Sequence, residues 1–317
     1  MQKIMVGLNK LMNTTNIECG DAIELFKDIP DNSIDLIVAD PPYNLGKDYG
    51  NNHDILGFEE YLDFSRKWIS EAKRTLSENG TIYIFMGVRF ISYLYDILDR
   101  EQGLFFNSWV IWHYTQGLGK TKGFSPRHDD ILVFNKSKNF KFNLDDVRVP
   151  QKYYRKRNNM RGANPGDVWT FSHVHYSNPN RQNHPTQKPE GLIERIILAS
   201  SDKGDVVLDP FAGSGTTLRV CQQLNRQCIG FELNPEYVEL VKTRLSEPFR
   251  GFDSIDNRME RVPNDLRDAD IRDKYLANHV NWFLKNHENA IDIFSKAIKE
   301  KYGVLYSEQI SKNEKDT

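Results

Sequence analysis

The feature that most constrains the fold is a short buried strand that ends abruptly at two prolines. Residues 34–39 form an apolar, largely β-branched run, and Asp40-Pro41-Pro42-Tyr43 follows it directly. Adjacent prolines cannot continue a hydrogen-bonded ladder, because neither has an N–H group and each fixes φ. Residues 40–43 are therefore expected to form a stiff loop at the carboxyl end of a strand, where open α/β sheets bind ligands. The alternative is an ordinary surface turn.

Strands and helices are predicted to alternate through the rest of this region. Strands are expected at residues 16–19, 34–39, 81–86, 105–113, 131–134 and 167–171, and helices at 22–27, 58–76 and 89–99. Asn79-Gly80 is expected to end the longest helix, and the aromatic side chains of these elements are assigned to the hydrophobic core rather than to a binding site. This alternation favours a doubly wound α/β sheet.

A glycine-rich loop follows a second buried strand, which is expected at residues 206–208. The loop reads Asp209-Pro210-Phe211-Ala212-Gly213-Ser214-Gly215-Thr216 and leads into a helix. Its glycines allow a tight turn and close approach to a ligand, and Asp209 at the strand tip suits an ammonium group. A phosphate-binding loop would require Gly-Lys-Ser/Thr, and the dinucleotide fingerprint would require a third glycine two residues further on. Neither is present, so both alternatives are disfavoured.

Together the two loops resemble those of the DNA amino-methyltransferases, which methylate an exocyclic amino group using S-adenosylmethionine. The order of the loops resembles the β-class of that family, and the resemblance extends from about Asn16 to Leu245. It implies a circularly permuted, Rossmann-like α/β sheet of seven mostly parallel strands. Residues 16–135 would form the catalytic half, 136–180 a target-recognition insert, 181–248 the cofactor-binding half, and 249–317 a charged helical extension.

The resemblance also implies which residues bind the cofactor. Asp21, which is expected to cap the helix at 22–27, would also contact the adenine of the cofactor. Thr186 and Lys188, ahead of an amphipathic helix expected at 191–200, would hold the methionine end, Lys188 through its carboxylate. Glu232 ends the next strand and would accept the ribose hydroxyls. The full predicted set is Asp21, Thr186, Lys188, Asp209, Phe211, Ala212, Gly213, Ser214, Gly215, Thr216, Glu232 and Asn234.

The predicted catalytic residues are Asp40, Pro41, Pro42 and Tyr43. Asp40 and the Pro41 carbonyl would accept the two amino hydrogens of the target base, and Tyr43 would stack on its ring. The base must first be flipped out of the duplex. In this family an acid before Pro-Pro accompanies adenine and a serine accompanies cytosine, so adenine N6 is expected and cytosine N4 is the alternative. A Pro-Cys loop, needed for carbon-5 methylation, is missing.

DNA contacts are expected from a local basic region, because the net charge of the whole chain is only −2. Residues 136–161 contain nine Lys and Arg against two Asp, a net charge of +7. Within this region Arg155, Arg157 and Asn158 are candidates for contacts to bases or phosphates, and Lys120 and Lys122 lie in a second basic loop. A plain solvated charged face is the alternative.

Metal binding and membrane insertion are not expected. The three cysteines lack metal-ligand spacing, which indicates a reduced, cytoplasmic environment, and no apolar run approaches the roughly 20 residues of a membrane span. His173, His175 and His184 are close in sequence but lack helical spacing and cysteine partners. His128, beside two acids, is assigned a structural rather than a catalytic role.

Several functional alternatives stay open. They are a non-catalytic DNA-binding module, and methylation of RNA or of protein glutamine, which short Pro-Pro-Tyr loops also serve. A partner restriction endonuclease and a homodimer are both compatible with the sequence. The helical pattern at residues 274–303 could pack on the sheet, form a dimer contact or contact DNA.

Overall fold

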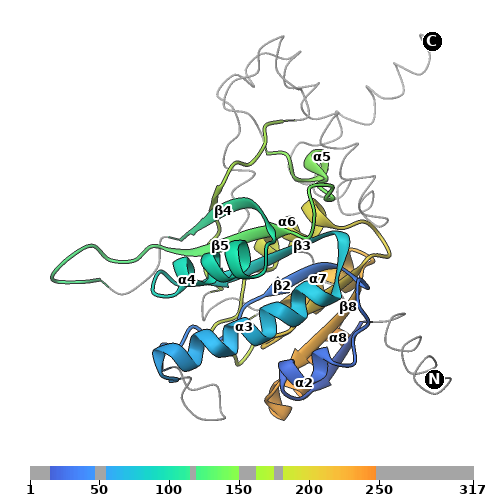
Figure 1. Ribbon diagram of the computed structural model, residues 1–317, viewed down its shortest axis with the longest axis horizontal. Coiled ribbons are helices and arrows are strands. Elements are labelled where there is room, and N and C mark those ends of the chain that lie inside the picture. The colour runs from blue at the N-terminus through green and yellow to red at the C-terminus, as the bar shows by residue number, and fades with distance from the viewer. Residues whose placement is uncertain (1–14, 47–54, 115–118, 150–161, 175–180, 248–317) are drawn as a thin grey trace, which may run out of the picture. The chain divides into compact units, whose positions relative to one another are not determined.

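The computed structural model describes residues 15–46, 55–114, 119–149, 162–174 and 181–247 (Figure 1). The chain divides into two compact units. One comprises Met1–Pro150 with Ala163–Arg261, and the other comprises Gln151–Gly162 with Val262–Thr317. The following description concerns the first unit, which contains every helix and strand named below. The predicted DNA contacts Arg155, Arg157 and Asn158, His175, and the C-terminal extension lie outside the described residues.

The core of this unit is one mixed sheet. Its strands are β1 (Asn16–Cys19), β2 (Ile34–Ala39), β3 (Leu76–Met86), β4 (Phe105–His113), β5 (His128–Asn135), β6 (Val168–Thr170), β7 (Val206–Asp209) and β8 (Gln227–Glu232). Their order is β1-β8-β7-β2-β3-β5-β4-β6, and only β5 runs antiparallel to its neighbours. The expected mostly parallel sheet is therefore confirmed. It has eight strands among the described residues, whereas the family resemblance implied seven, and the strand expected at 167–171 forms the edge as β6 beside β4.

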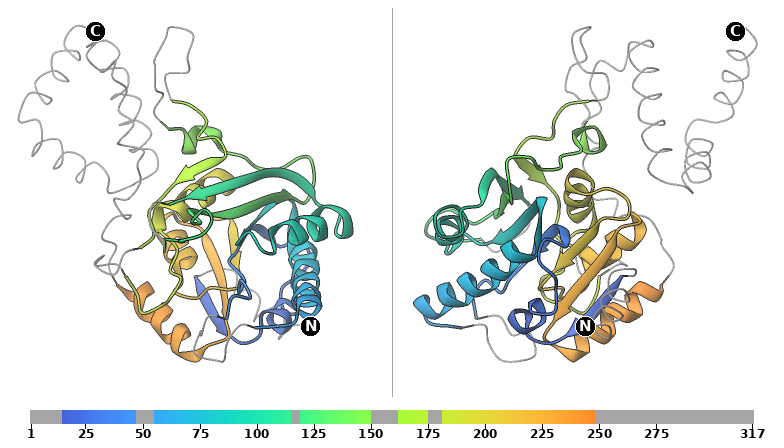
Figure 2. Two further views of the ribbon diagram at one scale, coloured as in Figure 1. Left: turned by 90° about the vertical axis from the view of Figure 1, so that its left-hand side faces the viewer. Right: turned by 45° about the vertical axis from the view of Figure 1, so that its right-hand side comes forward.

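Helices cover both faces of the sheet (Figure 2). They are α2 (Ala22–Phe26), α3 (Phe58–Thr75), α4 (Ile91–Asp96), the π-helical turn η1 (Ile97–Glu101), α5 (Leu144–Val147), α6 (Glu190–Ser200), α7 (Thr216–Gln223) and α8 (Pro235–Ser246). The first four pack on one face, around a core that includes Trp68 and Leu94, and α6, α7 and α8 cover the other. No helix in the described ranges is long and apolar enough to cross a membrane.

Two elements differ from the sequence prediction. β3 begins at Leu76, immediately after α3, so that Asn79-Gly80 lies inside the strand rather than before it. Ile34 pairs with Leu76 and Leu36 pairs with Thr81, so residues 77–80 form a bulge in β3. Within this bulge a Cβ on Gly80 would lie 3.0 Å from the Asp35 carbonyl oxygen. The second difference is α6, which is buried at every residue rather than amphipathic.

Part of the basic segment serves the fold itself. Lys136 donates to the Leu76 carbonyl at 3.0 Å, and Lys141 forms ion pairs with Asp202 and Asp205. These cations fix the chain after β5 against the sheet. Lys136 and Lys141 are therefore not available for DNA, and the net charge of residues 136–161 exceeds the charge that their described part could use to bind it.

The sheet topology brings the predicted loops to one edge. β1, β8, β7, β2 and β3 run parallel, so their carboxyl ends lie together. From β7 the chain passes through α7 to β8 on one side, whereas from β2 it passes through α3 to β3 on the other. The gap between the carboxyl ends of β2 and β7 is thus a topological switch point, where doubly wound sheets form their ligand crevice. Asp40 follows β2 and Asp209 ends β7.

Candidate functional site

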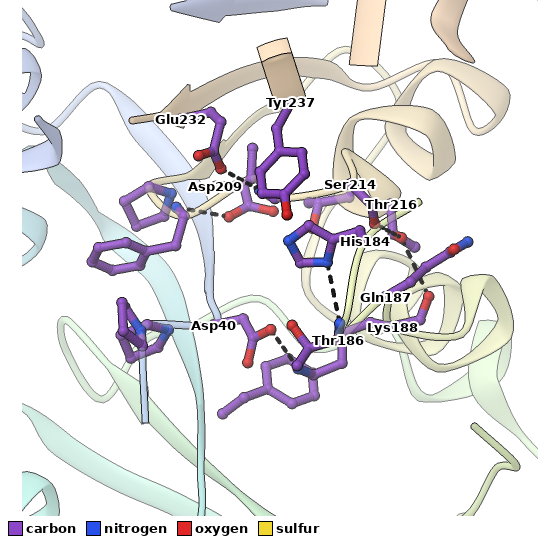
Figure 3. A pocket seen from close by; sticks show the side chains of 18 of the residues that line it. Asp40, His184, Thr186, Gln187, Lys188, Asp209, Ser214, Thr216, Glu232 and Tyr237 are labelled. Carbon is purple, nitrogen blue, oxygen red and sulfur yellow. Dashed lines mark hydrogen bonds and ion pairs between the residues drawn. The ribbon is translucent and has the colours of Figure 1, made fainter. Parts of the chain in front are cut away.

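A cavity of about 690 Å³ lies at this edge of the sheet (Figure 3). It is lined by residues at the ends of four parallel strands, namely Asp21, Asp40, Asp209 and Glu232. Pro41 to Tyr43 line the same cavity as Gly213 and Ser214, although about 170 residues separate the two loops in the sequence. The structure therefore brings the two predicted loops together in one crevice.

The Asp40 loop is held rigidly and leaves one acceptor unused. The Tyr61 hydroxyl of α3 donates to the Pro42 carbonyl at 2.7 Å. Oδ2 of Asp40 forms an ion pair with the ammonium group of Lys188. Oδ1 of Asp40 is buried and accepts no hydrogen bond from the described residues. A buried acceptor without a donor is costly, which indicates a position that a ligand's N–H group completes.

Aromatic side chains form one wall of the cavity. Tyr61, Phe64, Phe85 and Trp112 line it, together with Tyr43. The prediction that these side chains belong only to the core was incomplete, because Phe85 and Trp112 are buried and also face the cavity. Each is the penultimate residue of a strand that ends at the ligand-binding edge. That position was the signal in the sequence that could have identified them.

The glycine loop turns tightly around the other end of the cavity. Gly213 and Gly215 have φ values of +50° and +72°, a region that favours glycine. A Cβ on Gly213 would lie 2.9 Å from Nε2 of His184, and one on Gly215 would lie 2.7 Å from Val241. The Gly213 N–H donates to Oε2 of Glu232 at 2.8 Å. Glycine is therefore needed at both positions, and the Gly213 N–H anchors the loop to the end of β8.

A buried ion pair fixes the same loop to α6 and α8. Arg244 and Glu190 lie 2.7 Å apart, and their side chains are 4% and 5% exposed. Arg244 also donates to the Ser214 carbonyl at 2.8 Å and to the Thr216 hydroxyl at 3.2 Å. The Thr216 hydroxyl in turn donates to the Lys188 carbonyl at 3.2 Å. Thr216 therefore has a clear structural role beside its predicted contact with the cofactor.

Asp40, Asp209 and Glu232 lie close enough in the cavity for their charges to interact. Burial raises the pKa of Asp209 to about 7, although hydrogen bonds from Thr217 and Phe211 oppose the shift. The nearby charges of Asp40 and Glu232 raise it further. Burial also raises the pKa of Glu232, against hydrogen bonds from the N–H groups of Asn234 and Gly213. A cationic ligand would relieve this repulsion, and it would favour the charged form of each carboxyl group.

This charge pattern predicts pH-dependent cofactor binding. A cation beside Asp209 lowers its pKa, so binding releases a proton wherever the free protein holds Asp209 protonated. We expect the affinity for S-adenosylhomocysteine, which keeps the ammonium group, to rise by up to about tenfold per pH unit below pH 7 and to level off above it. Calorimetric titration across this range measures the slope. Asp209→Asn should flatten the slope of affinity against pH. An unchanged slope in that variant would contradict the placing of the ammonium group beside Asp209.

Other predicted residues lie as follows. Asp21 caps α2, accepting from the Ile23 N–H at 2.8 Å, so its predicted capping role is confirmed, and it also lines the cavity. Asn234 caps α8 by accepting from the Glu236 N–H at 2.9 Å, and neither it nor Gly215 lines the cavity. Lys120 and Lys122 are exposed outside it. The cofactor roles of the remaining residues stay predictions.

Sequence reasoning missed two rings beside the glycine loop. His184 and Tyr237 line the cavity with their ring centroids 4.7 Å apart (Figure 3). His184 lies at the start of the His-Pro-Thr-Gln-Lys-Pro segment, and Tyr237 lies in the first turn of α8. Among the described residues no cluster of three metal-ligating side chains occurs. His128 begins β5 but does not line the cavity.

Comparisons with known proteins agree with this geometry. A sequence model of a family described as DNA methylase matches residues 34–243. The chain is 62% identical over 285 residues to the Type II methyltransferase M.HpaI of Haemophilus parainfluenzae, covering 90% of this chain and 91% of that protein. It is 39% identical to the DNA adenine methyltransferase YhdJ of Escherichia coli K12, covering 71% and 81%. The crystal structure of an M1.HpyAVI–SAM complex superposes with a TM-score of 0.52 at 28% identity, covering 73% of this chain and 99% of that one.

Proposed function

The chain belongs to the DNA methylase family, and we propose that it transfers the methyl group of S-adenosylmethionine to the N6 amino group of adenine in duplex DNA. One observation carries the proposal. The buried and unsatisfied Oδ1 of Asp40 lies in the same cavity as the glycine loop. The acceptor for an amino hydrogen and the loop that would bind the cofactor therefore lie in one cavity.

The residues at the glycine loop fit S-adenosylmethionine. Any Cβ on Gly213 would contact His184, so only glycine fits at this position of the loop. Asp209 and Glu232 offer carboxylates to a cofactor that carries an ammonium group, a sulfonium and two ribose hydroxyls. When bound, the cofactor supplies an electrophilic methyl group. We assign Asp209, Glu232 and the loop from Phe211 to Thr216 to its binding.

The Asp40 loop activates the nucleophile. The lone pair of an adenine amino group is delocalised into the ring, so the nitrogen is a poor nucleophile. Asp40 and the Pro41 carbonyl would accept its two hydrogens and localise the lone pair, since the Pro42 carbonyl already accepts from Tyr61. Tyr43 would stack on the flipped base. Catalysis by these residues is positioning and electrostatic stabilisation, without a covalent enzyme intermediate.

Adenine is favoured over cytosine by the acid at position 40. A relative named as a DNA adenine methyltransferase, 39% identical over 241 residues, supports this choice. Cytosine N4 is the second candidate, because it presents the same amino geometry to Asp40. The purified chain should transfer a labelled methyl group to duplex DNA, and nucleoside analysis should find it in N6-methyladenine. Label in N4-methylcytosine would reject adenine, and label only in RNA or protein would reject the DNA substrate.

The loop between β4 and β5 is our candidate for DNA contact among the described residues. Lys120 and Lys122 are exposed on it, and the strands that it joins place Trp112 and Asp129 in the cavity wall. Cations beside the mouth of a base pocket would hold the phosphates that flank a flipped nucleotide. We also propose Arg155, Arg157 and Asn158 as contacts.

Replacing Lys120 and Lys122 by alanine should reduce the salt dependence of DNA binding. Removing one lysine–phosphate interaction lowers the slope of log K against log salt by about 0.9, so the slope of the double variant should fall by about 1.8. Fluorescence anisotropy over a salt series measures the slope. Lys203→Ala is the control variant, because Lys203 is exposed just before β7, at the opposite edge of the sheet from the cavity. An equal reduction in both variants would show that the loop has no special role.

The relative M.HpaI is named a Type II methyltransferase, and the high identity to it supports a site-specific enzyme paired with a restriction endonuclease. Sequencing the modified bases in DNA from cells that express the chain gives the recognition site. Methylation scattered over unrelated sequences would reject site specificity. A homodimer stays a prediction, which sedimentation of the purified chain tests.

A further inference from the structure

The ammonium group of Lys188 fills the pocket beside Asp40. It forms an ion pair with Oδ2 of Asp40 and lies 5.5 Å from the ring centroid of Tyr43, 5.3 Å from that of Phe85 and 5.9 Å from that of Trp112. The Lys188 side chain is only 10% exposed. Three rings and one carboxylate around an ammonium form a cation-binding cage.

The same groups are those that the target base requires. A flipped base needs a ring to stack on and a carboxylate that accepts its amino hydrogens, which are the proposed roles of Tyr43 and Asp40. The amino group of a base and the ammonium group of Lys188 cannot occupy this place together. Lys188 must therefore leave Asp40 before the base enters, and a desolvated ammonium leaves a carboxylate only for another partner.

The main chain of Lys188 lies beside the glycine loop, where the carboxylate of a bound cofactor could become the new partner of its ammonium group. Its carbonyl accepts from the Thr216 hydroxyl at 3.2 Å, and Thr216 begins α7 directly after the glycine loop. Arg244 holds the same hydroxyl at 3.2 Å. The backbone of Lys188 is thus fixed beside the cofactor loop while its side chain extends to the base pocket. Rotation of the Lys188 side chain alone would move its ammonium group from the base pocket to the cofactor loop.

We propose that Lys188 is a placeholder that occupies the target-amine position until the carboxylate of bound cofactor draws it away from Asp40. The base pocket then opens only in the cofactor-loaded enzyme, which couples base flipping to cofactor binding. The inference deepens the proposed function and rests on it. It assigns Lys188 as a positioning residue that acts on the order of binding, and its effect is measurable without turnover.

The test uses the full chain and a duplex with 2-aminopurine at the adenine that is methylated, because this base fluoresces when it is unstacked. With wild-type protein at saturation, checked by anisotropy, fluorescence should rise when S-adenosylhomocysteine is added. We expect a coupling of about 5- to 150-fold between the cofactor and the flipped state. By linkage, the duplex should tighten S-adenosylhomocysteine binding by the same factor.

Lys188→Met removes the cation and keeps a long side chain, so its complex should fluoresce without S-adenosylhomocysteine and gain little from it. Lys188→Gln provides a second neutral variant should the first not fold, and Lys188→Arg, which keeps the charge, should stay cofactor-dependent. Cofactor-independent flipping by the wild type would overturn the inference. So would continued dependence in both neutral variants, which is the result expected if the Lys188–Asp40 pair persists throughout the reaction. Methylation of the unmodified duplex is measured in parallel, and its absence would refute the proposed function instead.

Discussion

Replacing Asp40 by alanine should reduce the rate of methyl transfer by about 10²–10³-fold, the usual effect of removing one preorganised polar group from a reacting centre. The reason is that Oδ1 and Oδ2 of Asp40 are the side-chain acceptors at the place where the amino group would lie. Alanine leaves the amino lone pair delocalised. Single-turnover transfer of labelled methyl to duplex DNA, at saturating cofactor, measures the chemical step directly.

The matched control is Asp40→Asn, which keeps a carbonyl acceptor but removes the charge. Its rate should fall between those of the wild type and the alanine variant. S-adenosylhomocysteine affinity should not fall in either variant, because Asp40 lies in the base half of the cavity and its loss releases Lys188 from the ion pair. Wild-type transfer by the alanine variant would remove Asp40 from the mechanism, and loss of cofactor affinity equal to the loss of rate would move it to the cofactor site.

The parts of the fold that follow local rules were predictable from the sequence. The apolar run at 34–39 is β2, and Asp21 caps α2, because each depends on residues within a few positions. The meeting of the two loops also followed, since parallel strands place their carboxyl ends at one edge. The structure extends β3 back to Leu76 because Leu76 pairs with Ile34, whereas Asn79-Gly80 lies in the bulge between this pair and Thr81.

The contacts within the site could not be predicted in this way. Lys188 and Asp40 are 148 positions apart, and no local pattern says that their side chains meet. The aromatic wall was assigned to the core for a similar reason, since Phe85 is both buried and part of the cavity. Burial and ligand contact are indistinguishable by periodicity when a strand ends at a binding edge. These features arise from tertiary packing alone.

Breaking the Arg244–Glu190 pair should have the largest effect on stability. Both side chains are almost fully buried, so Arg244→Met would remove the cation that faces the Glu190 carboxylate. Loss of one member of a buried pair costs about 3–5 kcal/mol. Arg244 also donates to the Ser214 carbonyl, so the glycine loop should lose one of its anchors, and cofactor affinity should fall in the protein that stays folded. Urea unfolding measures the first effect and calorimetric titration the second.

Two further variants separate the loss of stability from the loss of cofactor affinity. Lys242→Met removes a cation from the same helix, where its pair with Glu239 is exposed, and it should leave the unfolding midpoint nearly unchanged. Combining Arg244→Met with Glu190→Leu removes both buried charges, so most of the lost stability should return. Cofactor affinity should remain low in that double variant, because the donors to Ser214 and Thr216 are still missing. Recovery of affinity together with stability would show that the pair supports only the fold and that the glycine loop keeps its shape without Arg244.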